Sequence, residues 1–164
     1  MRFLWLVLSL LATSGARAEA EAPPPEPLTP VSFGYGFDNP DILLRQRIFG
    51  IAHGVHLLLS ACLDKNENAE AVQQSYDAWH ATQEKVLEEV REQLAAYHFG
   101  AQAPRAHWQD VARVLGLKET VYPSLGEVSL PEACATLPQA LAQSRYDFAE
   151  QLKVAEGSGD AIPR

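Results

Sequence analysis

The segment from Asn39 to Leu63 constrains the fold of this chain more than any other stretch. It is the longest strongly apolar run after the N-terminus, and its apolar residues recur at alternating steps of four and three, the period of one helix face. The residues on this face are Leu44, Ile48, Ile51, Val55, Leu58 and Cys62. An Asp-Asn-Pro-Asp sequence at residues 38–41 is typical of a helix start, so we predict a central packed helix here.

The first 18 residues have the layout of a Sec signal peptide. A positive start, Met1-Arg2, precedes an apolar run from Phe3 to Ala12, and Ala16-Arg17-Ala18 matches an A-x-A cleavage site. The apolar run is shorter than the roughly 20 residues that span a membrane. The alternative is a buried N-terminal helix. We expect cleavage before Glu19 and, because the signal is of bacterial type, a periplasmic or secreted protein.

The charge of the chain limits its partners. The net charge is −8, and it becomes about −10 when Arg2 and Arg17 leave with the signal peptide. An acidic surface does not attract phosphate backbones or anionic lipid, so we expect no nucleic-acid binding. We also predict no transmembrane segment after signal removal, and the remaining length suits one domain.

Residues 19–38 form a proline-rich tether that continues into an aromatic arm. Ala20–Pro30 is too rich in proline for a helix. In Val31–Phe37 the residues Phe33, Tyr35 and Phe37 alternate with Ser or Gly, which places the three rings on one side of an extended chain. The arm either folds back over the helices or contacts a partner. Exposed aromatic clusters lower solubility, which favours the first interpretation.

Three further helical patterns follow the central one. They cover Ala69–Phe99, Pro104–Leu117, and a last stretch that begins at Pro131 or Pro138 and ends near Glu156. Gly100 is a typical helix C-terminal glycine. The sequence leaves the structure of residues 118–130 open. We predict an all-α, four-helix bundle-like single domain over residues 39–156, followed by a flexible tail at 157–164.

The chain has two cysteines, Cys62 and Cys134. In an oxidising compartment a single pair most often forms a disulfide, and this one would close a loop of about 70 residues. Free or intermolecular thiols are the alternative. A disulfide would bring the end of the first helix next to the start of the last.

Histidines are the candidate metal ligands. His53 and His56 lie one turn apart on the first helix, His80 lies on the second, and His107 lies in the third. Imidazoles of this kind bind Zn or Cu. Helical angles place His53 and His56 away from the packed face, so separate surface histidines are the alternative. The metal site is therefore a secondary hypothesis, and no cofactor is the primary one.

The face of the first helix that carries His53 and His56 also carries Phe49 and is unusually apolar for a back face. Either the aromatic arm or the third helix covers it, or it is a contact surface. We take Tyr35, Phe37 and Phe49 as candidate contacts with an envelope or extracellular protein partner. Recognisable catalytic motifs are absent, so the chain reads as an exported, non-catalytic binding protein of the bacterial cell envelope. A small hydrolase or isomerase is a further alternative. The ligand and the oligomeric state do not follow from the sequence.

Overall fold

A computed structural model describes residues 27–65, 69–121 and 125–159. Within these ranges the chain forms five α-helices, two short 3-10 helices and no strand, which confirms the predicted all-α fold. The predicted signal peptide and residues 19–26 of the predicted tether lie outside the described ranges.

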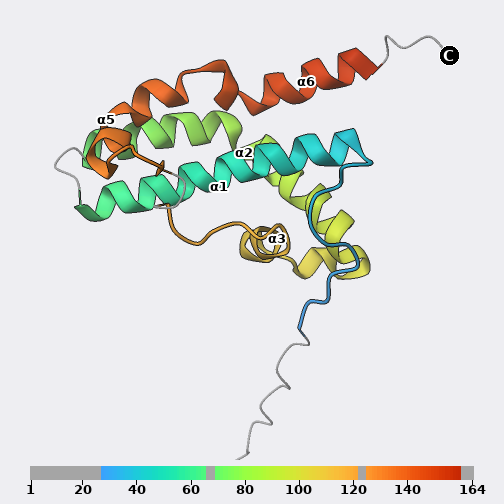
Figure 1. Ribbon diagram of the computed structural model, residues 1–164. Helices are drawn as coiled ribbons and strands as arrows, with labels where there is room; N and C mark the ends of the chain where they lie inside the picture. The colour runs from blue at the N-terminus through green and yellow to red at the C-terminus, as the bar shows by residue number, and fades with distance from the viewer. Residues whose placement is uncertain (1–26, 66–68, 122–124, 160–164) are drawn as a thin grey trace, which may run out of the picture.

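Two long helices form the centre of the molecule. Helix α1 (Pro40–Lys65) and helix α2 (Ala69–Phe99) run side by side in opposite directions (Figure 1). The side chain of Asn39 caps α1 by accepting a hydrogen bond from the backbone N–H of Ile42 at 3.2 Å. Helix α2 has the predicted bounds, and Gly100 ends it with φ +53°, a conformation that favours glycine.

Shorter helices cover the central pair on two sides. Helices α5 (Leu130–Leu141) and α6 (Phe148–Gly159) lie along one side, and α3 (Trp108–Val114) lies on the other (Figure 1). The last helix therefore includes residues 157–159 of the predicted tail. The rest of that tail, residues 160–164, lies outside the described part of the chain.

The third predicted helix is shorter than expected. Residues Gly100–Arg105 form the 3-10 helix η1, which contains Pro104, and α3 starts only at Trp108. The backbone N–H of His107 donates to the carboxylate of Asp110 at 2.9 Å, which fixes this later start.

The last predicted helix is two helices. The break holds the 3-10 helix η2 (Ser144–Tyr146), and two side chains of α2 bind the backbone of η2 and of the first residue of α6. The indole Nε1–H of Trp79 donates to the carbonyl of Tyr146, and the amide oxygen of Gln83 accepts from the N–H of Phe148, both at 2.9 Å. Pro138 lies inside α5 instead of starting a helix, and Ser129 caps α5 through the N–H of Glu132.

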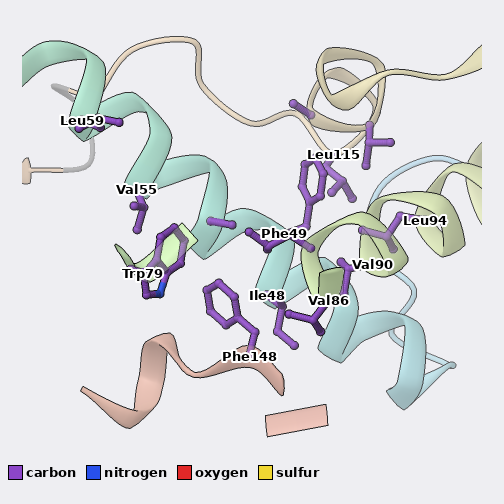
Figure 2. Close-up of a cluster of buried hydrophobic side chains, with 14 of the residues drawn as sticks. Ile48, Phe49, Val55, Leu59, Trp79, Val86, Val90, Leu94, Leu115 and Phe148 are labelled. Carbon is purple, nitrogen blue, oxygen red and sulfur yellow. The ribbon is translucent and has the colours of Figure 1, made fainter. Parts of the chain in front are cut away.

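The core lies between α1, α2 and the covering helices (Figure 2). From the predicted face of α1, Ile48, Val55 and Cys62 are buried, whereas Leu44, Ile51 and Leu58 are only partly buried. Figure 2 shows Phe148 reaching from α6 toward Ile48 and Trp79. The rings of Trp79 and Phe148 meet edge to face, with centroids 5.8 Å apart.

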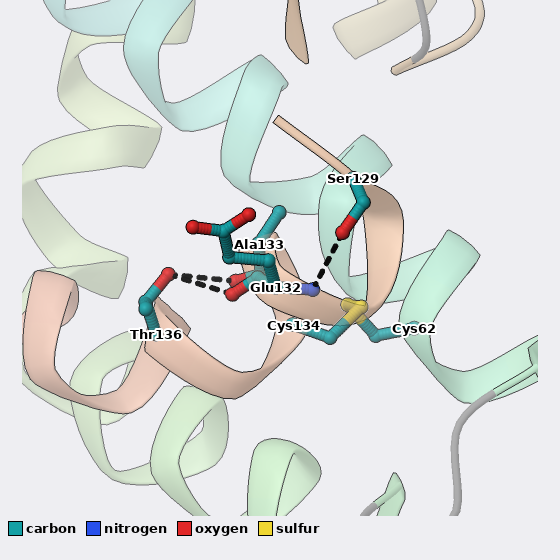
Figure 3. The surroundings of a disulfide bond; sticks show 6 residues. All are labelled: Cys62, Ser129, Glu132, Ala133, Cys134 and Thr136. Atoms are coloured by element: carbon teal, nitrogen blue, oxygen red, sulfur yellow. Dashed lines mark hydrogen bonds between the residues drawn. A yellow bond between two sulfur atoms is a disulfide. The ribbon is translucent and has the colours of Figure 1, made fainter. Parts of the chain in front are cut away.

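The predicted disulfide is present. Cys62 near the end of α1 is bonded to Cys134 in α5, both side chains are buried, and the Cα atoms lie 5.6 Å apart (Figure 3). The two residues are 72 positions apart, so the bond fixes the start of the C-terminal helices against the end of α1.

By length and composition alone, Pro40–Asp64 of α1 could cross a membrane. The core helix of a soluble protein meets the same criteria, and α1 supplies Ile48, Phe49 and Val55 to the core. The absence of a transmembrane segment in the mature protein stays a prediction.

Candidate functional site

Two regions hold the side chains that the sequence singles out. One is a cluster of histidine and aromatic rings between α1, α2 and α3, which we call the histidine cluster; it comprises His53, His56, Tyr76, His80 and Trp108. The other is the aromatic arm, Val31–Phe37, which crosses the ends of α1 and α2 that lie farthest from the disulfide (Figure 1).

Trp108 is the centre of the histidine cluster. Its ring stacks on Phe49 with centroids 4.0 Å apart and lies 4.9 Å from the ring of His56. Phe49 is completely buried. The third helix therefore covers the apolar back face of α1, which was one of the sequence alternatives, and the prediction that Phe49 contacts a partner is wrong for this fold.

Both ring nitrogens of His53 are occupied. The indole N–H of Trp108 donates to Nδ1 at 3.1 Å, which makes Nδ1 an acceptor and puts the proton on Nε2. That Nε2–H donates to the backbone carbonyl of Lys118 at 2.8 Å. A metal ion could bind His53 only after one of these bonds breaks, so the ring acts as a structural link between α1, α3 and the segment after α3.

His56 is held neutral by its surroundings. Its pKa is lowered to about 4, mostly by burial and to a smaller extent by the nearby rings of His80 and His53, because a second positive charge there is unfavourable. Its Nε2 is buried and has no hydrogen-bond partner within the described part of the chain. A buried acceptor or donor of this kind weakens the folded state unless something pairs with it.

His80 completes the cluster from α2. Its ring lies 6.2 Å from that of His56 and stacks on Tyr76 at 5.4 Å. Burial and the neighbouring Asp77 raise the pKa of Tyr76, which keeps this phenol neutral. The structure thus brings together three of the four candidate ligands, His53, His56 and His80. His107 instead lies exposed at the start of α3.

Among residues 27–65, 69–121 and 125–159, no group of three or more His, Cys, Asp or Glu side chains is placed to hold a metal ion. The geometry of the histidine cluster explains this result, because its rings pack by their faces and edges instead of directing nitrogens at one point. The Zn or Cu hypothesis receives no support from the arrangement.

A cleft of about 510 Å³ opens beside the cluster. Its walls are His53, His56, Leu57, Trp108, Gln109 and Glu119. A general base needs a nitrogen or oxygen that a substrate can reach. His53 uses both nitrogens in internal bonds and Nε2 of His56 is shielded, so these imidazoles are poorly arranged for proton transfer.

The aromatic arm is exposed. Phe33 and Phe37 are 73% and 76% exposed, Val31 is 72% exposed, and Tyr35 is 42% exposed. The rings of Tyr35 and Phe37 lie 6.1 Å apart. The backbone of the arm folds back onto the helices as the favoured interpretation required, but these side chains point outward and do not cover the bundle.

Hydrogen bonds hold the backbone of the arm in place. The N–H of Val31 donates to the carbonyl of His98 at 2.7 Å, and the N–H of Gly36 donates to Oε1 of Gln46 at 2.8 Å. Nε2 of Gln46 donates to the carbonyl of Gly34 at 3.0 Å. Farther along, the N–H of Thr29 donates to Oε1 of Gln102 at 2.9 Å.

Gly36 permits this close approach. It is buried, and a Cβ at this position would lie 3.0 Å from Cγ2 of Ile42 and 3.2 Å from the hydroxyl of Tyr97. A larger residue would force Ile42, Tyr97 or the arm to shift.

The sequence reasoning missed Gln46 and the role of His98, which are both completely buried. Gln46 lies between Arg45 and Arg47 in the first turns of α1, a sequence typical of an exposed polar helix end. The sequence does contain one sign that Gln46 is buried: it lies within one helical turn of the apolar residues Ile48 and Phe49.

The chain matches no known protein-family model, and no curated protein or solved structure shows significant similarity to it.

Proposed function

We propose that this protein is an exported, non-catalytic interaction protein of the bacterial cell envelope, and that it binds a protein partner through the aromatic arm. The observation that carries the proposal is the combination of exposed rings and a fixed backbone in one segment. Phe33 and Phe37 are about three-quarters exposed, yet buried Gln46 and His98 bind the backbone between and beside them.

Such an arrangement favours binding for two reasons. Aromatic side chains supply much of the energy of protein interfaces, because each buries a large apolar area with few rotatable bonds. A backbone that is already ordered loses less conformational entropy when a partner binds. The arm therefore presents its rings at low entropic cost.

A shallow hollow next to the arm extends the proposed surface. Its volume is about 200 Å³, and its walls are Leu28, Pro30, Phe33, Phe99, Asp110, Arg113 and Val114. A partner that receives Phe33 and Phe37 in an apolar groove could also insert an apolar side chain here. Because the chain is acidic and Asp38 and Asp41 are exposed beside the arm, the partner groove should have a basic rim.

Export is the second part of the proposal. The layout of residues 1–18 supports it, and so does the buried disulfide, since disulfides persist mainly in oxidising compartments. The mass of the mature protein purified from the periplasm or medium tests this part. Loss of residues 1–18, with Glu19 first, is the expected result, and an intact Met1 in the cytoplasm would contradict it.

Partner binding is tested with matched double variants. Wild-type protein is immobilised, a partner is captured from an envelope fraction, and the affinity of that purified partner is measured. Phe33→Ser/Phe37→Ser should weaken it by about 100-fold, which corresponds to two interface residues of roughly 1.4 kcal/mol each.

The control is Val128→Ser/Val154→Ser, which removes two other exposed apolar side chains, 45% and 57% exposed, outside the arm. It should leave the affinity unchanged. Equal affinity of the wild type and the Phe33/Phe37 variant, with both proteins folded by circular dichroism, would overturn the proposal.

A further inference from the structure

The hydrogen bonds between Gln46, His98 and the arm fix where every proton lies. The N–H of Gly36 can only donate, so the atom of Gln46 that it contacts at 2.8 Å is the carbonyl oxygen. The amide nitrogen of Gln46 then donates to the carbonyl of Gly34 at 3.0 Å and to Nε2 of His98 at 3.2 Å. Nε2 of His98 is therefore an acceptor without a proton.

The second ring nitrogen of His98 completes the network. Nδ1 lies 2.9 Å from the backbone carbonyl of Ser32, which only accepts, so Nδ1 carries the proton and donates it. The carbonyl of His98 itself accepts from the N–H of Val31. One neutral tautomer of one buried histidine thus satisfies the contacts from the arm and from α1.

A second proton on His98 breaks this pattern. The new Nε2–H would point at the amide NH₂ of Gln46, which is a donor and offers no lone pair. Rotating the Gln46 amide does not help, because its NH₂ would then face the N–H of Gly36 and its oxygen would face the carbonyl of Gly34. We propose that His98 and Gln46 form an acid-sensitive latch, which holds the aromatic arm against α1 and α2 while His98 is neutral and releases it when His98 is protonated.

The surroundings of His98 agree with a group that stays neutral at pH 7. Burial lowers the pKa of His98, and the hydrogen bond to Ser32 opposes this shift without reversing it. From α2, Tyr97 and Phe99 lie against the imidazole, with ring centroids 4.9 and 6.5 Å away.

Two ion pairs lie on the elements packed around the latch. On α1 the neighbouring Arg45 is bonded to Asp41, and on α3 Arg113 is bonded to Asp110 at 3.0 Å. On the arm side, Asp38 is exposed to solvent. None of these groups contributes to the shift in the pKa of His98, which burial dominates.

The sign of the pH dependence follows from this direction. The pKa of His98 is lower with the arm docked than with the arm released and the ring hydrated. The docking equilibrium of the arm is therefore most favourable above the ordinary histidine pKa. It becomes less favourable as the pH falls from there through the lowered pKa of His98. Each unit by which docking lowers this pKa corresponds to an approximately tenfold weaker docking equilibrium at acid pH.

The latch holds the same aromatic arm that we propose binds a partner. Its biological role, control of partner binding by acid, therefore rests on the proposed function. The structural device can be tested without any partner. Amide hydrogen exchange of Val31, Gly34 and Gly36 in the isolated full chain reports whether the arm is docked, after correction for the intrinsic pH dependence of exchange. Amides of Val90 and Leu94 in the core report global unfolding.

In wild-type protein the arm amides should lose protection between pH 7.5 and pH 5 while Val90 and Leu94 keep theirs. His98→Asn retains a donor toward Ser32 but cannot take up a proton, so its arm protection should be independent of pH. Gln46→Glu supplies a carboxylate oxygen to a protonated His98, so its arm should be better protected at pH 5 than at pH 7.5.

Gly36→Ala should weaken docking of the arm at every pH without removing the imidazole, because its Cβ would lie only 3.0 Å from Cγ2 of Ile42. Constant arm protection in the wild type, or the same acid release in His98→Asn or in Gln46→Glu, would overturn the latch. If the affinity of the partner is the same for the wild type and for Phe33→Ser/Phe37→Ser, the proposed function is overturned. The hydrogen-exchange results would still support the latch in that case.

Discussion

The amide oxygen of Gln83 in α2 accepts a hydrogen bond from the backbone N–H of Phe148, the first residue of α6, at 2.9 Å. Gln83 lies among the buried apolar residues of α2, and its side chain is buried as well. It satisfies a helix N-terminal donor that would otherwise be unpaired beneath the C-terminal segment. Together with the bond from Trp79 to Tyr146, it explains why the last helix is interrupted at this point.

Replacing Gln83 should destabilise the protein through this donor. Gln83→Leu leaves the N–H of Phe148 buried and unpaired, which costs about 1–3 kcal/mol in the free energy of unfolding. Gln74→Leu is the matched control on the same helix. The exposed amide of Gln74 donates to Glu70, and its loss should change stability by about a few tenths of a kcal/mol. Urea denaturation measures both. Equal effects of the two variants would contradict the role assigned to Gln83.

The disulfide should account for a large part of the stability. It closes a loop between residues 72 positions apart, and the chain-entropy model assigns about 4 kcal/mol to a loop of this size. Cys62→Ser/Cys134→Ser should lower the free energy of unfolding by about this amount. Reduction of the wild type with dithiothreitol should give a similar loss, and denaturation curves that do not respond to the reductant would refute this estimate.

His56 should make stability depend on pH. Its pKa is about 4 in the folded protein and about 6.5 when unfolded, so the unfolded state takes up the proton first as the pH falls. Stability that is complete above pH 6.5 should therefore decline toward pH 4, by no more than about 3 kcal/mol and by less where solvent screens the ring.

The contribution of His56 appears as a difference between variants. His56→Phe retains an aromatic ring but cannot be protonated, so its stability should decline less than that of the wild type between pH 6.5 and pH 4. His107→Phe changes an exposed histidine and should follow the wild-type curve. Parallel curves for wild type and His56→Phe would show that this imidazole does not titrate as described.

Metal titration distinguishes the proposed function from its main alternative. Because His53 uses both nitrogens and Nε2 of His56 is buried, we expect neither Zn(II) nor Cu(II) to bind stoichiometrically at micromolar concentration. Calorimetry of the untagged protein measures this directly. Tight binding that disappears in His53→Ala/His56→Ala would instead establish the metal-binding alternative.

The sequence predicts those features that depend on the period of apolar residues along one element. The bounds of α2 and the buried positions Ile48 and Val55 follow from such patterns. The pairing of Cys62 with Cys134 follows instead from the presence of two cysteines in a chain expected to be exported. The break between α5 and α6 follows from neither, because Leu141 and Phe148 keep a helical period across it while side chains of another helix stabilise the interruption.

The candidate site was less accessible to sequence reasoning for the same physical reason. Phe49 lies on the back of α1, and only the position of Trp108 in a different helix shows that it is buried. Gln46 and His98 are 52 positions apart, so the network that holds the arm depends entirely on tertiary contact. The alternating pattern of the arm favoured rings packed against the helices, whereas Phe33 and Phe37 are exposed.

Photo-crosslinking in living cells tests the central claim, that the aromatic arm binds a partner, most directly. A photoreactive phenylalanine analogue is placed at Phe37, which is 76% exposed in the arm, and in a second strain at Val154, which is 57% exposed on α6. The account predicts one discrete crosslinked envelope protein from position 37 and none from position 154. Identical crosslinking patterns from the two positions, or no crosslinked protein from position 37, would contradict it.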